Sequence, residues 1–276
     1  MNRRIDSHQH FWKYNPERDA WITDDMNIIR KDFLPSDLKP LLEENRVEGC
    51  VAVQADTSNE ETLFLLELAA QNPFIKGVVG WVDLLAEDLE ETLEDYVKEA
   101  KLKGFRHILQ AEPDGFMKNP KFVKAVNLLG SKGYCYDVLV THKQLEETVA
   151  FASMIEETPL VIDHIAKPDI KNGEVEHWEK YMSQLAKQPY IYVKLSGMVT
   201  EADWKNWTSD DLKKYISTTL DLFGTERVMF GSDWPVCLVA ASYRQVVDAL
   251  EKVVNQLTVS EKASIFGSNA SRFYNL

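Results

Sequence analysis

Two histidines near the start of the chain have a spacing that suits a shared site. His8 and His10 lie two residues apart in the segment 5–11, which is predicted to form a strand. Side chains two positions apart in a strand point to the same face, so the two imidazoles are expected side by side. Paired imidazoles can bind a divalent metal ion or polarise a carbonyl group. The pair therefore marks a candidate catalytic or metal site.

Polar residues also end two apolar segments later in the chain. Asp163 and His164 close the run LVIDH, and Asp233 follows the run RVMFGS. A carboxylate at the carboxyl end of a barrel strand is typical of a catalytic residue, although an Asp there can also cap the next helix. Taken alone, His164 after an apolar run is better explained as a buried structural histidine. Trp234 and Pro235 follow Asp233 directly and predict a shaped turn.

Two cations are expected within β-rich segments. Arg106 shares one strand face with Gln110, and Lys194 lies in the run YVKLSG. A buried guanidinium is costly unless it is paired. We therefore expect Arg106 to form an ion pair with Asp137, to bind a substrate oxygen, or both. Lys194 is expected either to bind substrate or to pair with a neighbouring carboxylate.

The elements that must position these residues alternate regularly. Eight short β-rich segments are separated by amphipathic stretches of helical period, one of which is expected to continue as far as Gly104. Eight alternating strands and helices predict a (β/α)8 TIM barrel, with residues 1–276 forming a single domain. An open doubly wound sheet is the rival, but it usually carries a Gly-rich turn after its first strand. The predicted strands are 5–11, 49–55, 76–82, 104–110, 133–140, 160–165, 190–195 and 227–232.

The segment 12–35 is long for a barrel connection and rich in aromatic residues. It contains Trp12 and Trp21, which predict a functional wall or lid over the end of the barrel. Three further histidines have weaker claims to a site. His107 is expected to face away from Arg106, and His142 and His177 are expected on solvated helices.

Composition narrows the class of partner. The chain of 276 residues carries 31 basic and 44 acidic residues and a formal charge of −13. Such a surface disfavours nucleic acid and anionic lipid, so we expect neither as a partner. Its three cysteines do not suggest a disulfide framework, and no apolar run reaches the roughly 18 residues of a membrane span. We expect a cytoplasmic protein; the oligomeric state is left open, a homodimer included.

These residues, taken in their order along the chain, form a pattern that resembles the amidohydrolase superfamily. The closer resemblance is to its sugar-lactonase branch, which includes L-fuconolactonases and L-rhamnonolactonases. The resemblance spans nearly the whole chain and rests most on DSHQHFW at 6–12 and GSDWPVC at 231–237. The further segments that carry it are GFRHILQ, YDVLV, DHIAKP, KLSGMVTEADW and NASRFY.

The departures from the superfamily pattern concern the metal. Binuclear members carry a bridging Lys on the fourth strand and a His on the fifth, where this sequence has Arg106, His107 and Asp137. The resemblance therefore implies no binuclear site. A single divalent ion, zinc first, is expected on His8, His10 and Asp233, with His164 as a further candidate. Chemistry without a metal is the alternative, because a related lactonase branch works without one.

The resemblance implies hydrolysis of a sugar lactone, a small-molecule substrate. Asp233 is expected as general base toward water and then as acid toward the ring oxygen, with His164 and Arg106 acting on the carbonyl. Substrate contacts are expected from His8, His10, Trp12, Gln110, Lys194 and Trp234. The alternatives are decarboxylation of an aromatic or unsaturated acid, hydrolysis of a cyclic amide, and an inactive barrel that serves as a binding protein.

Overall fold

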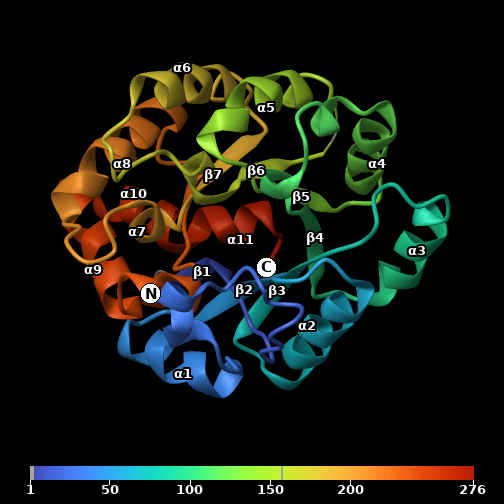
Figure 1. Cartoon of the computed structure of the whole chain (residues 1–276), viewed down its shortest axis with the longest axis horizontal. Helices are drawn as coiled ribbons and strands as arrows, with labels where there is room; N and C mark the ends of the chain where they lie inside the picture. The colour runs from blue at the N-terminus through green and yellow to red at the C-terminus, as the bar shows by residue number, and fades with distance from the viewer. Residues whose placement is uncertain (1–2, 157) are drawn as a thin grey trace.

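A computed structural model describes residues 3–156 and 158–276, and its eight parallel strands form a barrel (Figure 1). The strands follow one another in chain order from β1 to β8, which confirms the predicted (β/α)8 fold and excludes the doubly wound sheet. Their bounds are β1 Ile5–Gln9, β2 Gly49–Val53, β3 Ile75–Gly80, β4 Leu102–His107, β5 Cys135–Val138, β6 Leu160–Ile162, β7 Ile191–Leu195 and β8 Val228–Phe230.

The barrel is closed by contacts between β1 and the residues that follow β8. The amide of Asp233 donates to the carbonyl of His8 at 2.8 Å, and the amide of His10 donates to the carbonyl of Trp234 at 2.7 Å. The buried carboxylate of Asp6 accepts the amides of His8 at 3.1 Å and Ser232 at 2.9 Å. These bonds fix His10 and Asp233 on adjacent parts of the barrel rim.

Helices surround the strands on the outside of the barrel (Figure 1). Local sequence sets where several begin: Ser58 Oγ accepts the amide of Glu61 at the start of α2, and Asn119 Oδ1 caps α4 before its first-turn Pro120. The helices are α1 Pro35–Glu44, α2 Asn59–Gln71, α3 Leu89–Asp95, α4 Pro120–Ser131, α5 Leu145–Ala152, α6 Glu176–Leu185, α7 Met198–Glu201, α8 Ser209–Phe223, α9 Tyr243–Val253, α10 Val259–Ala263 and α11 Asn269–Phe273.

Each predicted strand differs from the observed strand by a few residues at one or both ends, and two of the wrong boundaries have a clear structural reason. The helix expected to reach Gly104 ends with α3 at Asp95 and a short 3-10 turn, and Gly104 lies inside β4 against Cys135, where a side chain would clash. The sixth strand ends at Ile162 rather than at 165, because the chain turns sharply from Asp163 onward.

The carboxyl-terminal segment closes one end of the barrel. In Figure 1, α11 crosses the region enclosed by the strands. Ala270 and Tyr274 pack with barrel residues Ile5, Val51 and Met229 in a small buried cluster that is separate from the main core. Because this segment seals the amino-terminal ends of the strands, a substrate must enter from their carboxyl ends.

Candidate active site

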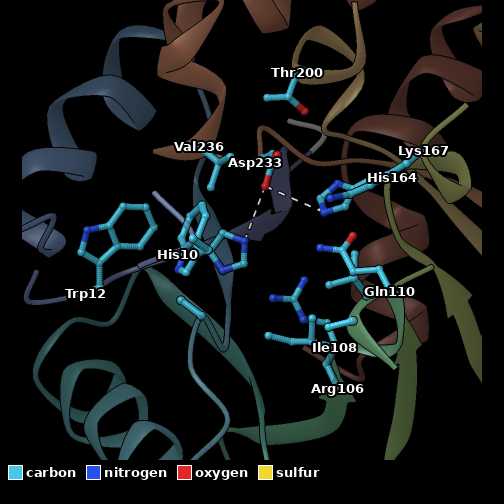
Figure 2. A pocket seen from close by; sticks show the side chains of 14 residues that line it. His10, Trp12, Arg106, Ile108, Gln110, His164, Lys167, Thr200, Asp233 and Val236 are labelled. Carbon is cyan, nitrogen blue, oxygen red and sulfur yellow. Dashed lines mark ion pairs between the residues drawn. The ribbon is translucent and has the colours of Figure 1, made fainter. Parts of the chain in front are cut away.

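A pocket of about 340 Å³ opens at the carboxyl ends of the strands (Figure 2). This is the end of the barrel where the fold places chemistry. Apolar side chains and polar groups both contribute to its wall. The lining residues are His10, Trp12, Trp21, Ala55, Arg106, Ile108, Gln110, Ala111, Leu139, His164, Lys167, Thr200, Asp233 and Val236.

The segment 12–35 forms one wall of this pocket. Trp12 and Phe33 pair through backbone hydrogen bonds of 3.0 and 2.9 Å, and Trp12 Nε1 donates to the carbonyl of Lys31 at 2.9 Å. Trp12 is therefore held rigidly. Trp21 packs edge-on against it with ring centroids 6.1 Å apart and is 44% exposed. The structure places both indoles beside the pocket, as the aromatic content of the segment suggested.

The hydrogen bonds of His10 determine which of its nitrogens faces the pocket. Nδ1 donates to the carbonyl of Val53 at 2.8 Å, so the lone pair of the neutral ring is on Nε2. Nε2 lies 3.1 Å from His8 Nε2 and 3.5 Å from Asp233 Oδ1. Burial lowers the pKa of His10 and holds that of His8 well below its ordinary value. Both rings are thus neutral near pH 7.

Asp233 is the carboxylate around which the imidazoles gather. Besides His10, its Oδ1 lies 3.9 Å from His8 Nε2 and 3.9 Å from His164 Nε2. Burial opposes ionisation, but His164 and His10 outweigh it and lower the pKa of Asp233. Asp233 is therefore an ionised carboxylate in a nearly buried position at the pocket floor, the state that a general base requires.

His164 reaches the site through an unusual turn after β6. Four successive residues have positive φ: His164 at 53°, Ile165 at 47°, Ala166 at 59° and Lys167 at 45°. None is glycine, and this region costs roughly 1–2 kcal/mol per residue for other amino acids. The fold compensates by holding the turn: Trp178 Nε1 donates to the carbonyl of Ile165 at 2.7 Å. We call residues 164–167 the left-handed turn.

Two further contacts hold the left-handed turn. His142 Nδ1 donates to the carbonyl of Lys167 at 2.7 Å, so His142 is half-buried and bonded rather than solvated as expected. His164 Nδ1 is hydrogen-bonded to Ser196 Oγ at 2.8 Å, which directs Nε2 toward Asp233. His177 is exposed on α6, as predicted.

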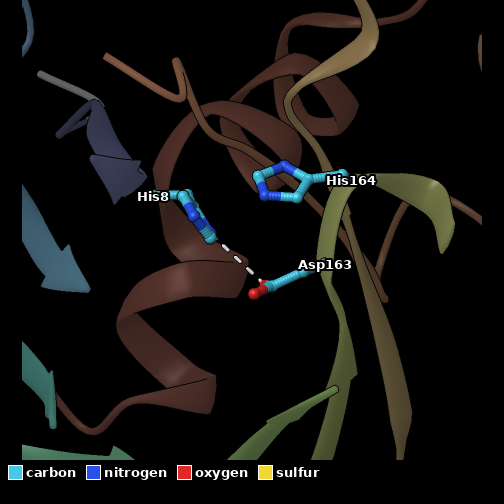
Figure 3. A group of neighbouring side chains, drawn as sticks. All are labelled: His8, Asp163 and His164. Atoms are coloured by element: carbon cyan, nitrogen blue, oxygen red, sulfur yellow. Dashed lines mark ion pairs between the residues drawn. The ribbon is translucent and has the colours of Figure 1, made fainter. Parts of the chain in front are cut away.

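A buried network of charges lies beneath the pocket. Lys194 Nζ contacts Asp137 and lies 2.9 Å from Asp163 Oδ1 and 3.0 Å from His8 Nδ1. Burial acts to lower the pKa of Lys194, but the two carboxylates outweigh it and raise that pKa. Figure 3 shows His8 beside Asp163, with Nδ1 and Oδ1 at 3.3 Å, and His164 close by. Lys194 thus fixes His8 from below and pairs with carboxylates, one of its two predicted roles.

The expected ion pair between Arg106 and Asp137 is not formed. Arg106 Nη1 instead contacts Asp163 Oδ2 at 3.2 Å, and Nη2 donates to the carbonyl of Gln54. Arg106 and Asp137 are paired in the register of β4 and β5, but both oxygens of Asp137 are taken by Lys194 and by the hydroxyl of Tyr274. The guanidinium therefore turns toward the end of β6.

The charges of this network almost balance. Arg106 and Lys194 offset Asp137 and Asp163, and the buried histidines are neutral, so the negative charge of Asp233 remains. Lys194 and His8 hold the pKa of Asp163 well below its usual range against the effect of burial. A surplus negative charge facing imidazole lone pairs favours a bound cation.

The residues present fit one divalent metal ion. His8, His10 and Asp233 each offer a ligand atom, and these atoms lie 3.1, 3.5 and 3.9 Å apart. Tetrahedral zinc with ligands at about 2.0–2.1 Å would place them about 3.3 Å apart. A second grouping of His8, Asp163 and His164 fits less well, because Asp163 is already bound by Lys194 and Arg106.

The predicted site residues fall at three kinds of position. Trp12 and Gln110 line the pocket, as do His10, His164, Arg106 and Asp233. His8 and Lys194 are fully buried one layer below it. Trp234 is 1% exposed and packs edge-on against Phe33, so its ring offers no free face to a sugar, contrary to our expectation.

Sequence reasoning missed Lys167 and Thr200, which both line the pocket (Figure 2). Each lies in a segment that carries the family resemblance, DHIAKP and KLSGMVTEADW, and that position was the available signal. Among the described residues, no helix has both the length and the hydrophobicity needed to cross a bilayer.

Comparison with known proteins assigns the family. The amidohydrolase family model matches residues 5–276, and the chain belongs to this family. An L-fucono-1,5-lactonase of Burkholderia multivorans is 41% identical, with 99% of this chain and 96% of that protein aligned. An L-fucono-1,5-lactonase of Burkholderia ambifaria is 35% identical over 100% of this chain and 97% of that protein. A crystal structure of a zinc-bound amidohydrolase from Burkholderia multivorans superposes with a TM-score of 0.97 at 40% identity, over 99% of both chains.

Proposed function

We propose that this protein is a lactonase that hydrolyses a sugar lactone, with L-fucono-1,5-lactone as the first candidate substrate. The observation that carries the proposal is the ionised Asp233 at the floor of the pocket, 3.5–3.9 Å from three imidazoles whose pKa values burial lowers. The two L-fucono-1,5-lactonases at 41% and 35% identity support the choice of substrate.

Asp233 performs the proton transfers in this proposal. Its carboxylate takes a proton from water as the water oxygen bonds to the lactone carbonyl carbon. It then returns that proton to the ring oxygen as the carbon–oxygen bond of the ring breaks, giving the aldonic acid. The same residue can serve both steps because the water oxygen and the ring oxygen are bonded to the same carbon, the carbonyl carbon of the lactone.

His164 and Arg106 line the same part of the pocket and act on the carbonyl oxygen. Nitrogen donors aimed at this oxygen stabilise the negative charge that develops on it, and loss of one such donor typically costs about 100- to 1,000-fold in rate. Ser196 fixes the ring of His164, and Asp163 fixes the guanidinium, so little reorganisation is needed.

A zinc ion fits His8, His10 and Asp233 and, when bound, supplies Lewis acidity toward the carbonyl oxygen. The solved zinc-bound relative supports this assignment. The hydrogen bond from His10 Nδ1 to the carbonyl of Val53 leaves the lone pair of His10 on Nε2. Asp163 and Lys194 contact Nδ1 of His8 and hold its ring in place. These contacts orient the two imidazoles before any ligand arrives.

The test is a pH-indicator assay of the purified protein on L-fucono-, L-rhamnono-, L-galactono- and D-sugar lactones, with and without a chelator. We expect acid release from at least one sugar lactone, and a loss of at least about 1,000-fold in Asp233→Asn. Asp221→Asn, a surface change, is the control. No acid release from any lactone contradicts the proposal, and carbon dioxide release from aromatic acids would favour the decarboxylase alternative.

A further inference from the structure

The pocket contains a cation that the reaction described above does not use. Lys167 lines the pocket beside His164, and its side chain is 22% exposed (Figure 2). Its Nζ lies 4.0 Å from Glu201 Oε1 on α7. That distance permits electrostatic attraction but is too long for a hydrogen bond, so both groups can still bond to a third one.

Hydrogen bonds to its backbone hold Lys167 in this position. It is the last residue of the left-handed turn, and its own amide donates to the carbonyl of His164 at 2.8 Å. The hydrogen bond from His142 Nδ1 to the carbonyl of Lys167 anchors the same residue. One turn therefore presents both the imidazole of His164 and the ammonium of Lys167 to the pocket, a fixed distance from Asp233.

The charge around Lys167 indicates what it binds. Glu201 balances the ammonium, and Asp163 balances Arg106, the other cation that lines the pocket. The charge of each cation is therefore already neutralised by a protein carboxylate, so neither is available to pair with a carboxylate on the substrate. An ammonium whose charge is already balanced instead suits a neutral hydroxyl group, whose oxygen can accept a hydrogen bond from Nζ.

We propose that Lys167, oriented by Glu201, is the residue that recognises the ring hydroxyls of the substrate, and that the enzyme selects neutral, polyhydroxylated lactones over unsubstituted or carboxylated ones. This inference rests on the proposed lactonase function and deepens it. Lys167 contacts substrate away from the carbonyl that reacts, whereas Glu201 is a positioning residue.

The experiment compares two lactones with the same six-membered ring. L-Fucono-1,5-lactone carries ring hydroxyls, and δ-valerolactone carries none. For Lys167→Met we expect kcat/KM on the sugar lactone to fall about 10- to 100-fold, mainly through KM, because a charged hydrogen bond is lost. On δ-valerolactone the change stays within about threefold. Lys171→Met, four residues further on and exposed, is the matched control.

An equal loss on both lactones in Lys167→Met, or no loss on either, overturns the inference. If the wild-type protein hydrolyses neither lactone, the proposed function fails, and calorimetric binding of L-fucose, a neutral polyol that cannot react, decides the subsite. Binding by the wild type that weakens at least tenfold in Lys167→Met supports the subsite. Equal binding by the two proteins, or no binding by the wild type, overturns it.

Discussion

The hydroxyl of Tyr274 donates to Asp137 inside the barrel, 3.0 Å from each carboxylate oxygen. Asp137 in turn holds Lys194, which contacts His8. The carboxyl-terminal segment is thus connected to the candidate active site through three buried side chains. Burial raises the pKa of Asp137 to about 6, and the Tyr274 hydroxyl acts in the opposite direction.

Removing the Tyr274 hydroxyl should therefore destabilise the protein. Tyr274→Phe keeps the ring in its cluster but deprives a buried carboxylate of a donor, and we expect a loss of about 1–3 kcal/mol in the free energy of unfolding, measured with urea at pH 7. Tyr215→Phe is the control, because that hydroxyl donates only to backbone carbonyls at the outside of the barrel. Equal stability of Tyr274→Phe and wild type would refute this account.

Lys194→Met should be more damaging, because it leaves Asp137 and Asp163 facing each other without their shared cation. Breaking a buried ion pair on one side typically costs about 3–5 kcal/mol. Asp163 keeps Arg106 as its partner, whereas Asp137 is left with the Tyr274 hydroxyl. Adding Asp137→Asn removes this unpaired charge, so the double variant should recover a large part of the loss in urea unfolding. A double variant no more stable than Lys194→Met would contradict the charge balance described above.

The sequence allowed those site residues to be predicted that lie in or directly after a barrel strand. His8, His10, His164 and Asp233 were predicted from polar residues at the ends of alternating strands, and the barrel brings all four together. Strand alternation is a strong signal because each strand needs an apolar core face, and the carboxyl ends of all eight strands meet at one rim.

Other features depend on which side chains compete for the same partner in the folded protein, and the sequence does not show this competition. Arg106 and Asp137 are neighbours in register, yet the carboxylate of Asp137 binds Lys194 of β7 and the hydroxyl of Tyr274 near the end of the chain. The left-handed turn contains no glycine to signal it. Trp234 follows a site residue, but its ring packs edge-on against Phe33 and is buried.

His10 should control metal binding. His10→Ala removes one of three ligand atoms, and we expect zinc affinity, measured by calorimetry on chelator-treated protein, to fall at least about 100-fold. His177→Ala, an exposed histidine on α6, should leave the affinity unchanged. Unchanged zinc affinity in His10→Ala would place the ion elsewhere.

Glu61 should make stability depend on pH. Burial raises its pKa to about 7, and its carboxylate accepts the amide of Ala55, a pocket residue. The ordinary pKa is 4.5, so the folded state binds the proton more tightly, and stability falls as pH rises from about 4.5 to 7. Glu61→Gln keeps an acceptor without the charge.

We expect Glu61→Gln to match wild type in urea unfolding at pH 4.5 and to exceed it by about 2–3 kcal/mol at pH 8. Glu60→Gln, an exposed change on the same helical turn, should have no such pH dependence. A difference that is the same at both pH values would argue against titration of Glu61.

The buried charges also bear on how the chain folds. The paired charges are far apart in sequence: Arg106 and Asp163 are separated by 57 residues, and so are Asp137 and Lys194. A partly assembled barrel that lacked β4 or β7 would hold some of these carboxylates without their cations, in a place where water is excluded. Such intermediates are penalised, so the last strands should dock together in one cooperative step rather than one at a time.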